Sequence, residues 1–188
     1  MTIRQIIMDY KIRKAVDSDA QAVHDIYGEY VGDLDVTFTV NNPSVEHYRE
    51  KIAQSKYPFY VAEGSDGAIL GYCCGSPLRP HDAYRWNVES TIILSKSAPK
   101  RQGIGTALYH AFIDDLKALN YQYVYAVIVD INETSIAMHS TLGFKEVGRF
   151  HNAGYKQGHW LGIVWMSLPI GNPSSVKEPI TPAEQALF

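Results

Sequence analysis

The amino-acid sequence predicts an α/β domain in which a mixed β-sheet carries helices on both faces. Two observations support this prediction: strand-like apolar runs alternate with stretches of helical periodicity, and turn or cap residues separate them. The 188 residues fit one domain, because a chain of this size buries roughly 70% of its unfolded surface. We assign residues 1–168 to this single domain and residues 169–188, which are rich in Pro and Ser, to a C-terminal extension outside the core.

The N-terminal half has the pattern of a strand, two helices and two further strands. Asp17 or Ser18 is a favourable N-cap for the first helix, and Ser44 opens the second. A turn at Ser65-Asp66-Gly67 separates the two strands that follow. The expected ranges are a strand at 10–13, helices at about 18–30 and 44–52, and strands at 59–63 and 69–76.

The C-terminal half adds four strands and two helices. A long amphipathic helix ends at Asn120, and a short one lies between Asn132 as its N-cap and Gly143 as its C-terminal stop. The run Tyr123–Val129 lacks polar alternation, so we expect it to be buried on both faces near the centre of the sheet. The expected ranges are strands at 86–94, 123–129, 145–150 and 160–168, and helices at 104–119 and 133–142.

Composition excludes several classes of protein. A formal charge of −3 and a pI near 6.1 give no signature of nucleic-acid binding. No run approaches the ~18 to 20 apolar residues of a membrane span, and the N-terminus lacks a cleavable leader pattern. Cys73 and Cys74 are adjacent in a strand and point to opposite faces, which predicts free thiols and a cytoplasmic location. The histidines show no metal-ligand spacing, so we expect no metal.

The loop Lys100-Arg101-Gln102-Gly103-Ile104-Gly105 lies between a strand and the long helix. The free N–H groups and the positive end of that helix meet there, which suits a phosphate group, and the two basic residues add charge. The pattern by itself is equally compatible with a tight structural turn. A Walker A loop would need Gly-Lys followed by Ser or Thr, and a dinucleotide fingerprint would need a third glycine and a downstream acid; neither is complete.

These segments together resemble the acetyl-CoA core of GNAT acetyltransferases. The resemblance rests on the (R/Q)-x-x-G-x-(G/A) loop, here with Lys100 at its first position, and on the run Asn132 to His139 that leads into Leu142-Gly143-Phe144. It implies a GNAT-like fold and acetyl-CoA as co-substrate, with the diphosphate on the loop and the pantetheine arm between two splayed strands. The contacts implied are Ile92, Ile93, Leu94, Lys100, Arg101, Gln102, Gly103, Ile104, Gly105, Thr106, Asn132 and Ser135.

A closer resemblance covers about residues 10–168 and points to the branch of phosphinothricin and methionine sulfoximine acetyltransferases. Five separated blocks carry it: Thr37-Phe38, Tyr57-Pro58, Ala83 to Ser90, Asn132 to Phe144, and Gly154 to Trp160. Those enzymes acetylate the α-amine of glutamate-like compounds, which implies a small amino-acid-like substrate here. The likeness also implies a homodimer in which the last strands help to form the interface.

Glu89 is the candidate general base. Alternation places it on the same strand face as Thr91 and Ile93, where partial burial would raise its pKa toward a useful value for deprotonating an ammonium group. A backbone N–H between Ile92 and Leu94 can receive the oxyanion if the strand splays. Direct attack needs no covalent intermediate, and no His or Asp pattern activates Cys73 or Cys74. A glutamate at a strand end that merely faces solvent or pairs with Arg85 is the competing interpretation.

The remaining site candidates follow from the resemblance. His139 occupies the helix position where many GNAT enzymes carry a tyrosine that protonates the departing thiolate, although a packed structural histidine explains it equally well. Phe38, Arg79, His81 and Tyr84 are the expected substrate contacts, with Arg79 as the partner of a carboxylate and His81 at a position where relatives often carry arginine.

Two other functions remain open at this point. The acceptor could be another amine, such as a polyamine, an aminoglycoside or a protein N-terminus; the first two favour an acidic pocket, which the Arg79 to His81 loop does not provide. Alternatively, the chain could be a non-catalytic acetyl-CoA sensor. Only an enzyme would depend on Glu89, so substitution of that residue separates the two classes.

Overall fold

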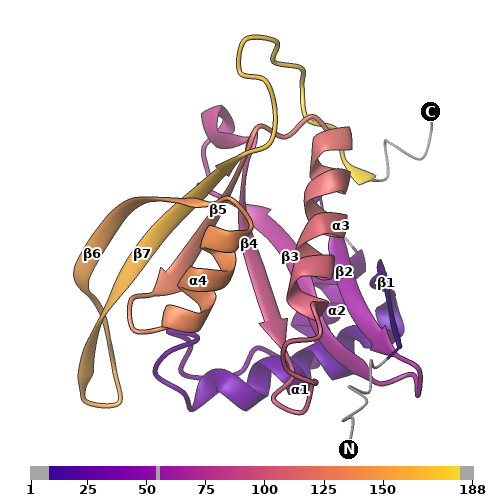
Figure 1. The fold of residues 1–188 in the computed structure, drawn as a ribbon, viewed down its shortest axis with the longest axis vertical. Coiled ribbons are helices and arrows are strands. Elements are labelled where there is room, and N and C mark those ends of the chain that lie inside the picture. The colour runs from indigo at the N-terminus through magenta and orange to yellow at the C-terminus, as the bar shows by residue number, and fades with distance from the viewer. Residues whose placement is uncertain (1–8, 54–55, 183–188) are drawn as a thin grey trace, which may run out of the picture.

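The computed structural model describes residues 9–53 and 56–182. Its centre is a seven-stranded sheet with the order β1-β2-β3-β4-β5-β7-β6, in which β4 and β5 form a parallel pair and every other neighbouring pair is antiparallel (Figure 1). The elements are β1 (Tyr10–Lys14), the 3-10 turn η1 (Asp17–Asp19), α1 (Ala20–Val31), α2 (Val45–Ala53), β2 (Phe59–Gly64), β3 (Ile69–Pro77), the 3-10 turn η2 (Asp82–Tyr84), β4 (Asn87–Leu94), α3 (Ile104–Ala118), β5 (Tyr123–Val129), α4 (Glu133–Thr141), β6 (Lys145–Lys156) and β7 (His159–Pro169).

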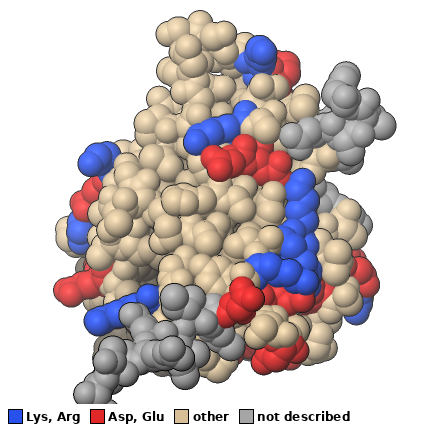
Figure 2. All heavy atoms as spheres, turned by 45° about the vertical axis from the view of Figure 1, so that its right-hand side comes forward, with Lys and Arg blue, Asp and Glu red and all other residues tan. Residues whose placement is uncertain are grey.

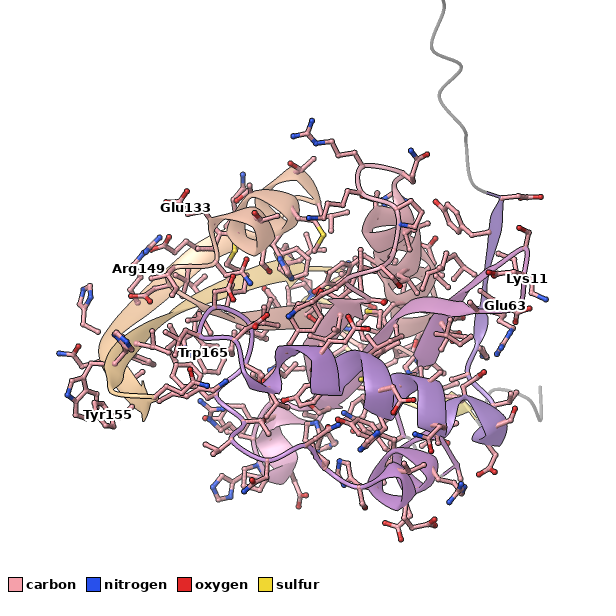
Figure 3. The ribbon with its side chains drawn as sticks, turned by 90° about the horizontal axis from the view of Figure 1, so that it is seen from below. Lys11, Glu63, Glu133, Arg149, Tyr155 and Trp165 are labelled. Atoms are coloured by element: carbon pink, nitrogen blue, oxygen red, sulfur yellow. The ribbon has the colours of Figure 1, made fainter. Side chains whose placement is uncertain are left out.

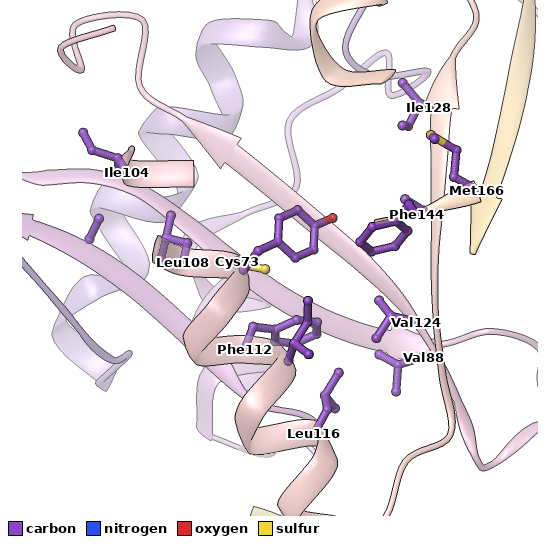
Figure 4. Close-up of a cluster of buried hydrophobic side chains, with 14 of the residues drawn as sticks. Cys73, Val88, Ile104, Leu108, Phe112, Leu116, Val124, Ile128, Phe144 and Met166 are labelled. Atoms are coloured by element: carbon purple, nitrogen blue, oxygen red, sulfur yellow. The ribbon is translucent and has the colours of Figure 1, made fainter. Parts of the chain in front are cut away.

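Two apolar clusters bind the helices to opposite faces of the sheet. The larger one joins α3 and α4 to one face and includes the fully buried Phe112 and Leu116 (Figure 4). The smaller one joins α1 and α2 to the other face through residues such as Val23 and Tyr72. Cys73 belongs to the first cluster and Cys74 to the second, as the alternation of strand side chains predicts. The predicted mixed sheet with helices on both faces is confirmed.

Several helix ends follow from their sequences. The Ser44 hydroxyl accepts the N–H of His47 at 3.2 Å, and the Asn132 side chain accepts the N–H of Ser135 at 3.0 Å. Gly143 has a φ of 96°, the left-handed conformation expected at a helix stop. At the turn between β6 and β7, Gln157 and Gly158 both have positive φ, as a two-residue hairpin of type I′ requires.

The start of the first helix differs from the prediction. Neither Asp17 nor Ser18 caps it, because both lie in the short turn η1 and α1 begins at Ala20. The carboxylate of Asp19 instead accepts the N–H of Val16 at 2.8 Å and two guanidinium N–H groups of Arg13, at 2.7 and 2.9 Å. This bidentate ion pair ties the turn to β1, which lies at the edge of the sheet.

The prediction that β5 is buried on both faces is wrong. Its side chains alternate between buried and half-buried, and Tyr123, Tyr125 and Val127 are the half-buried ones. The buried set, which includes Val124 and Ala126, faces the α3 cluster. The other face of β5 carries a tyrosine pair with ring centroids 6.2 Å apart rather than a covering helix, so an apolar run can be half-exposed.

The segment after β7 runs back along the domain. The Trp86 indole N–H donates to the carbonyl of Lys177 at 2.8 Å, and the N–H of Ile180 donates to the carbonyl of Leu119 at 3.1 Å. Arg85 forms an ion pair with Glu178 across the same junction. Ile170 and Ile180 also pack against the larger cluster, whereas residues 171–178 between them are exposed, so the predicted extension touches the core at these two points.

Figure 2 shows the face on the α3 and β1 side of the molecule, where positive and negative side chains are interspersed. Part of this mixture comes from ion pairs of β1, in which Lys11 contacts Glu63 and Lys14 contacts Asp115. No extended area of one sign is visible on this face. None of the helices within residues 9–53 and 56–182 is both long enough and apolar enough to cross a bilayer.

We expect Phe112→Ala to lower the free energy of unfolding by about 3–5 kcal/mol, because it removes a fully buried ring from the centre of the larger cluster and leaves a cavity. His110→Ala on the exposed face of the same helix is the matched control and should change the stability by less than about 0.5 kcal/mol. Urea unfolding followed by circular dichroism measures both. Equal stabilities for the two variants would contradict this account of the core.

Candidate active site

The parallel strands β4 and β5 pair only at their beginning. Their register runs from Asn87 opposite Tyr123 to Glu89 opposite Tyr125 and then stops. Immediately beyond, the Ser90 hydroxyl donates to the carbonyl of Tyr125 at 3.0 Å, so a side chain takes the place of a main-chain bond. The two strands diverge from this point and leave a gap in the sheet (Figure 1).

The main-chain donors of β4 in this gap can be identified from the pairing on its other edge. The N–H of Ser95 bonds to the carbonyl of Leu70 on β3 at 2.9 Å. Because successive N–H groups of a strand point to opposite edges, those of Ile92 and Leu94 point toward β5. Beyond Glu89, β5 no longer pairs with this edge. Two N–H donors therefore face the opening, as the sequence predicts for a splayed strand.

Two cavities border the gap. The first has a volume of about 290 Å³, and its lining includes Tyr27, Val36, Thr37, Phe38, Glu89, Ser90, Thr91, Ile92, Ile93, Tyr109, Asn132, Ser135 and His139. The second has a volume of about 880 Å³ at the start of α3, and its lining includes Tyr30, Leu94, Lys100, Arg101, Gln102, Gly103, Ile104, Gly105, Thr106 and Met138. The predicted acid and the predicted phosphate loop thus lie in neighbouring cavities joined by β4 and α4. We call them the acceptor cavity and the loop cavity.

Glu89 is half-buried at the last paired position of β4. Loss of water around its carboxylate raises the pKa above the ordinary value of 4.5, while the positive charges of Arg79 and Lys51 act in the opposite direction. The net effect is an increase. A carboxylate with a raised pKa in a cavity has the properties of a general base. The solvent-facing glutamate and the Arg85 pair that competed with this interpretation do not occur, since Arg85 contacts Glu178.

His139 belongs to a buried hydrogen-bonded chain. Its Nδ1 lies 2.7 Å from the carbonyl of Ser135, which can only accept, so Nδ1 carries the proton. Nε2 therefore accepts from the hydroxyl of Tyr109 at 2.6 Å, and Tyr109 also contacts Ser90 at 2.9 Å. Burial lowers the pKa of His139 more than the bond to Ser135 raises it. His139 is thus a neutral imidazole whose two nitrogens are both engaged.

The loop before α3 has the backbone that a phosphate site needs. Arg101 and Gly103 have φ values of 61° and 77°, and no side chain caps the first turn of α3. The N–H groups at this helix start are therefore available for an anion. A Cβ on Gly105 would lie 3.1 Å from the sulfur of Met138, so the glycine allows α3 to approach α4 closely. The side chain of Asn132 caps α4 and also lines the acceptor cavity.

The predicted substrate contacts divide into two groups. Phe38 lines the acceptor cavity, and a Cβ on Gly154 would overlap its ring, so Phe38 packs directly on the backbone of β6. Arg79 lies outside the cavity lining, with its guanidinium 4.9 Å from the ring centroid of Trp165, yet its charge reaches Glu89. His81 and Tyr84 are exposed around η2 and do not line either cavity.

Comparisons with known proteins agree with this geometry. The model of the acetyltransferase (GNAT) domain family matches residues 12–165. The chain belongs to this family. It is 31% identical over 167 residues to a phosphinothricin N-acetyltransferase of Streptomyces coelicolor, covering 86% of this chain and 97% of that one. It is 29% identical to an L-methionine sulfoximine/L-methionine sulfone acetyltransferase of Pseudomonas paraeruginosa, covering 86% and 95%.

Structural similarity leads to the same family. A phosphinothricin acetyltransferase from Sinorhizobium meliloti, crystallised in complex with acetyl-CoA, superimposes with a TM-score of 0.85 at 33% identity, covering 93% of this chain and 97% of that one. The predicted GNAT fold and the class of acetyl-CoA-dependent N-acetyltransferase are confirmed.

Sequence reasoning did not single out four side chains that lie in or near these cavities. Lys51 lies on α2 and Tyr109 on α3, and neither stands in a recognisable motif. Trp165 carries a buried indole N–H with no hydrogen-bond partner among the described residues, next to Arg79. Lys156 is only 4% exposed, and its ammonium donates to the carbonyls of Asp33 and Thr37 at 2.6 and 2.7 Å. The surroundings of these four side chains depend on contacts between segments that are far apart in the sequence. A local sequence pattern therefore does not predict them.

Two alternative chemistries find no support in the geometry. Burial raises the pKa of both the Cys73 and the Cys74 thiol, which opposes formation of a nucleophilic thiolate. Both cysteines are unpaired. Within residues 9–53 and 56–182, no group of three or more His, Cys, Asp or Glu side chains has the arrangement of a metal site.

We expect Lys156→Met to lower the free energy of unfolding by about 2 kcal/mol, because two carbonyls of the segment that carries Phe38 lose a charged donor. Hydrogen exchange should accelerate in residues 32–38 of the variant more than in the sheet. Lys145→Met, on the exposed part of the same strand, is the control. Unchanged exchange in residues 32–38 would show that Lys156 does not hold this segment.

Proposed function

We propose that the protein transfers the acetyl group of acetyl-CoA to the primary amine of a small amino-acid-like substrate, with Glu89 as the general base. The observation that carries the proposal is the position of Glu89. It is half-buried in the acceptor cavity, at the point where β4 and β5 diverge and beside the free N–H groups of Ile92 and Leu94. Base, oxyanion donors and phosphate loop are thus arranged along one strand and the helix start that follows it.

The residues present fit acetyl-CoA. The left-handed Gly103 and the uncapped first turn of α3 leave main-chain N–H groups for a diphosphate, and Lys100 and Arg101 add positive charge to the loop cavity. The open edge of β4 offers main-chain groups for the extended arm. The remaining contacts that we propose for the co-substrate are Ile92, Ile93, Leu94, Gln102, Ile104, Gly105, Thr106, Asn132 and Ser135.

The chemistry needs a proton acceptor first, because an α-amine is mostly an ammonium at neutral pH. Glu89 takes one proton, and the amine lone pair then forms a C–N bond to the thioester carbon. The N–H of Ile92 or Leu94 donates to the oxygen on which negative charge develops. Glu89 passes the first proton to solvent. When the C–S bond breaks, the nitrogen gives its second proton to water and the thiolate gains one from its own donor. Alignment of the two substrates supplies most of the acceleration.

His139 and Tyr109 are the proposed source of the proton for the thiolate. His139 has its single N–H bound to Ser135, so the donor that we propose is the Tyr109 hydroxyl, whose O–H turns from Nε2 of His139 toward the thiolate and later regains a proton from solvent. Both residues line the acceptor cavity. This modifies the simpler expectation that His139 is itself the donor. A purely structural role of the buried chain predicts that Tyr109→Phe lowers stability and leaves the basic limb of the pH profile unchanged.

The amino-acid character of the substrate is supported by the cation near the base. Arg79, whose positive charge acts on Glu89, is a cation that suits an α-carboxylate. Phe38 forms an apolar wall of the cavity. His81 and Tyr84 remain predicted contacts at the rim. The named activities of the Streptomyces and Pseudomonas relatives, on phosphinothricin and on methionine sulfoximine or sulfone, favour this class over polyamines and aminoglycosides.

A homodimer through the β6–β7 hairpin is part of the proposal. Four large side chains are more than half exposed there, and Figure 3 shows Tyr155 at the outer edge of the hairpin, away from the core. Isolated hydrophobic side chains on a surface are ordinary, but a cluster marks an interaction site. The cluster consists of Val147, Phe150, Tyr155 and Trp160. The two free cysteines are compatible with the reducing cytoplasm, where we propose that the enzyme acts.

We expect Glu89→Gln to reduce kcat by about 10²–10⁴-fold, since proton abstraction is lost, while the Kd of acetyl-CoA changes little.

In the wild type the acid limb of the pH profile of kcat/KM should lie above pH 4.5, because burial raises the pKa of Glu89 and activity is lost as Glu89 becomes protonated. Arg79→Gln should move this limb to higher pH, since Arg79 opposes the shift. Thiol release and calorimetry measure these effects. Equal turnover by wild type and Glu89→Gln would refute the base assignment.

We expect light scattering at micromolar concentration to give the mass of a dimer for the wild type, and of a monomer for Trp160→Glu, because a charge placed in an apolar interface is costly to desolvate. The matched control is His110→Glu, on the exposed face of α3. A monomeric wild type would rule out the dimer and leave the catalytic proposal intact.

A further inference from the structure

The Ser90 hydroxyl is shared between two neighbours in the wall of the acceptor cavity. Its Oγ lies 3.0 Å from the carbonyl oxygen of Tyr125 and 2.9 Å from the hydroxyl oxygen of Tyr109. Tyr109 lies in turn 2.6 Å from Nε2 of His139. Ser90 is only 8% exposed and Tyr109 is fully buried, so the two hydroxyls depend on these contacts for their hydrogen bonds.

The three contacts share two hydrogen atoms. The neutral ring of His139 gives its one N–H to the carbonyl of Ser135, so its Nε2 can only accept, as can the carbonyl of Tyr125. The hydrogens must therefore come from the hydroxyls of Ser90 and Tyr109, which have one each. When Tyr109 donates to Nε2 and Ser90 donates to the carbonyl, both acceptors are satisfied. The oxygens of Ser90 and Tyr109 then face each other at 2.9 Å with no hydrogen between them.

This contact without a hydrogen becomes important when Tyr109 gives up its proton. The Tyr109 oxygen is then an anion, and Nε2 of His139 has no hydrogen to donate to it. Ser90 can donate by rotating its O–H, and no heavy atom has to move, because the two oxygens are already 2.9 Å apart. A hydrogen bond to a charged acceptor is roughly twice as strong as one to a neutral carbonyl, so the rotation is favourable.

The surroundings of Tyr109 make such a donor necessary. Burial raises the pKa of Tyr109 well above its ordinary value, and the hydrogen bond with Ser90 acts in the opposite direction. The rings of Phe112, His139 and Phe144 pack around Tyr109, and none of them carries a positive charge. A phenolate in these surroundings would be costly without a hydrogen-bond donor, and Tyr109 would then be a poor acid.

We propose that Ser90 is the positioning residue that enables Tyr109 to act as the acid. As the proton passes from the Tyr109 oxygen to the sulfur of the thiolate, the Ser90 O–H turns from the Tyr125 carbonyl to the Tyr109 oxygen. The O–H bond of Tyr109 breaks, the S–H bond forms, and Ser90 keeps its own hydrogen. Ser90 turns back when Tyr109 regains a proton from solvent. The proposal rests on the proposed function, because it takes Tyr109 as the proton donor.

A double-mutant cycle separates this role from the bond between Ser90 and the Tyr125 carbonyl. We expect Ser90→Ala to slow the chemical step about tenfold or more in the wild type, because the Tyr109 oxygen loses its donor. In the Tyr109→Phe background, which has no proton to give, the same change should slow it by no more than about twofold. Single turnovers with bound acetyl-CoA and phosphinothricin measure the chemical step apart from product release. The Kd of acetyl-CoA, from calorimetry, should stay within about twofold.

Two further variants test whether the hydroxyl itself matters. Ser90→Thr keeps the hydroxyl and should bring the rate to within about threefold of the wild type. Ser140→Ala is the matched control, because it removes an exposed hydroxyl that donates to a main-chain carbonyl of α4 at 2.9 Å, and it should behave as the wild type. Thermal unfolding verifies that each variant is folded.

Equal slowing by Ser90→Ala in both backgrounds would overturn the proposal, since a purely structural loss does not depend on the Tyr109 hydroxyl. A Tyr109→Phe variant as fast as the wild type would also overturn it, while leaving the transfer reaction and the role of Glu89 in place. If phosphinothricin is not acetylated but another amine is, the acceptor class of the proposed function fails. The same cycle with that amine then still decides the role of Ser90.

Discussion

The early end of the β4–β5 pairing is the constraint on which the site depends. A sheet whose parallel strands stayed paired would use every main-chain N–H of β4 internally, and no oxyanion donor would remain. Here Ser90 bonds to the carbonyl of Tyr125 and the register stops at Glu89, so the strand edge beyond it is open. The same divergence places the acid, the open edge and the start of α3 in sequence along one path through the fold.

Burial has different consequences for the ionisable groups around that gap. Glu89 loses part of its hydration and becomes a better base, although two cations limit the shift. His139 is more deeply buried, becomes neutral and is held by Ser135 and Tyr109. Burial raises the pKa of both thiols, although the charge of Lys51 acts in the opposite direction on Cys74. Only the first of these groups has both exposure to the cavity and a pKa moved toward neutrality.

The walls of the acceptor cavity are assembled from distant parts of the chain. The segment with Phe38 follows α1, and Lys156 at the end of β6 holds it through bonds that span 123 and 119 residues of sequence. Gly154 leaves room for the Phe38 ring on the same strand. The β6–β7 hairpin, which carries Lys156 and Gly154, also carries the exposed aromatic cluster. An interface formed by this cluster would therefore lie close to the wall of the acceptor cavity.

The sequence by itself determined the order of the elements, the caps at Ser44 and Asn132, the stop at Gly143 and the phosphate-type loop, because each depends on contacts within a few residues. It also singled out Glu89. The tertiary structure alone decided that β5 is half-exposed, that Tyr109 meets His139 from 30 residues away, and that Lys156 bonds to the carbonyls of Asp33 and Thr37. Sheet register and helix packing determine which distant residues come into contact. Both depend on many weak interactions along the whole chain, so no local sequence pattern predicts these contacts.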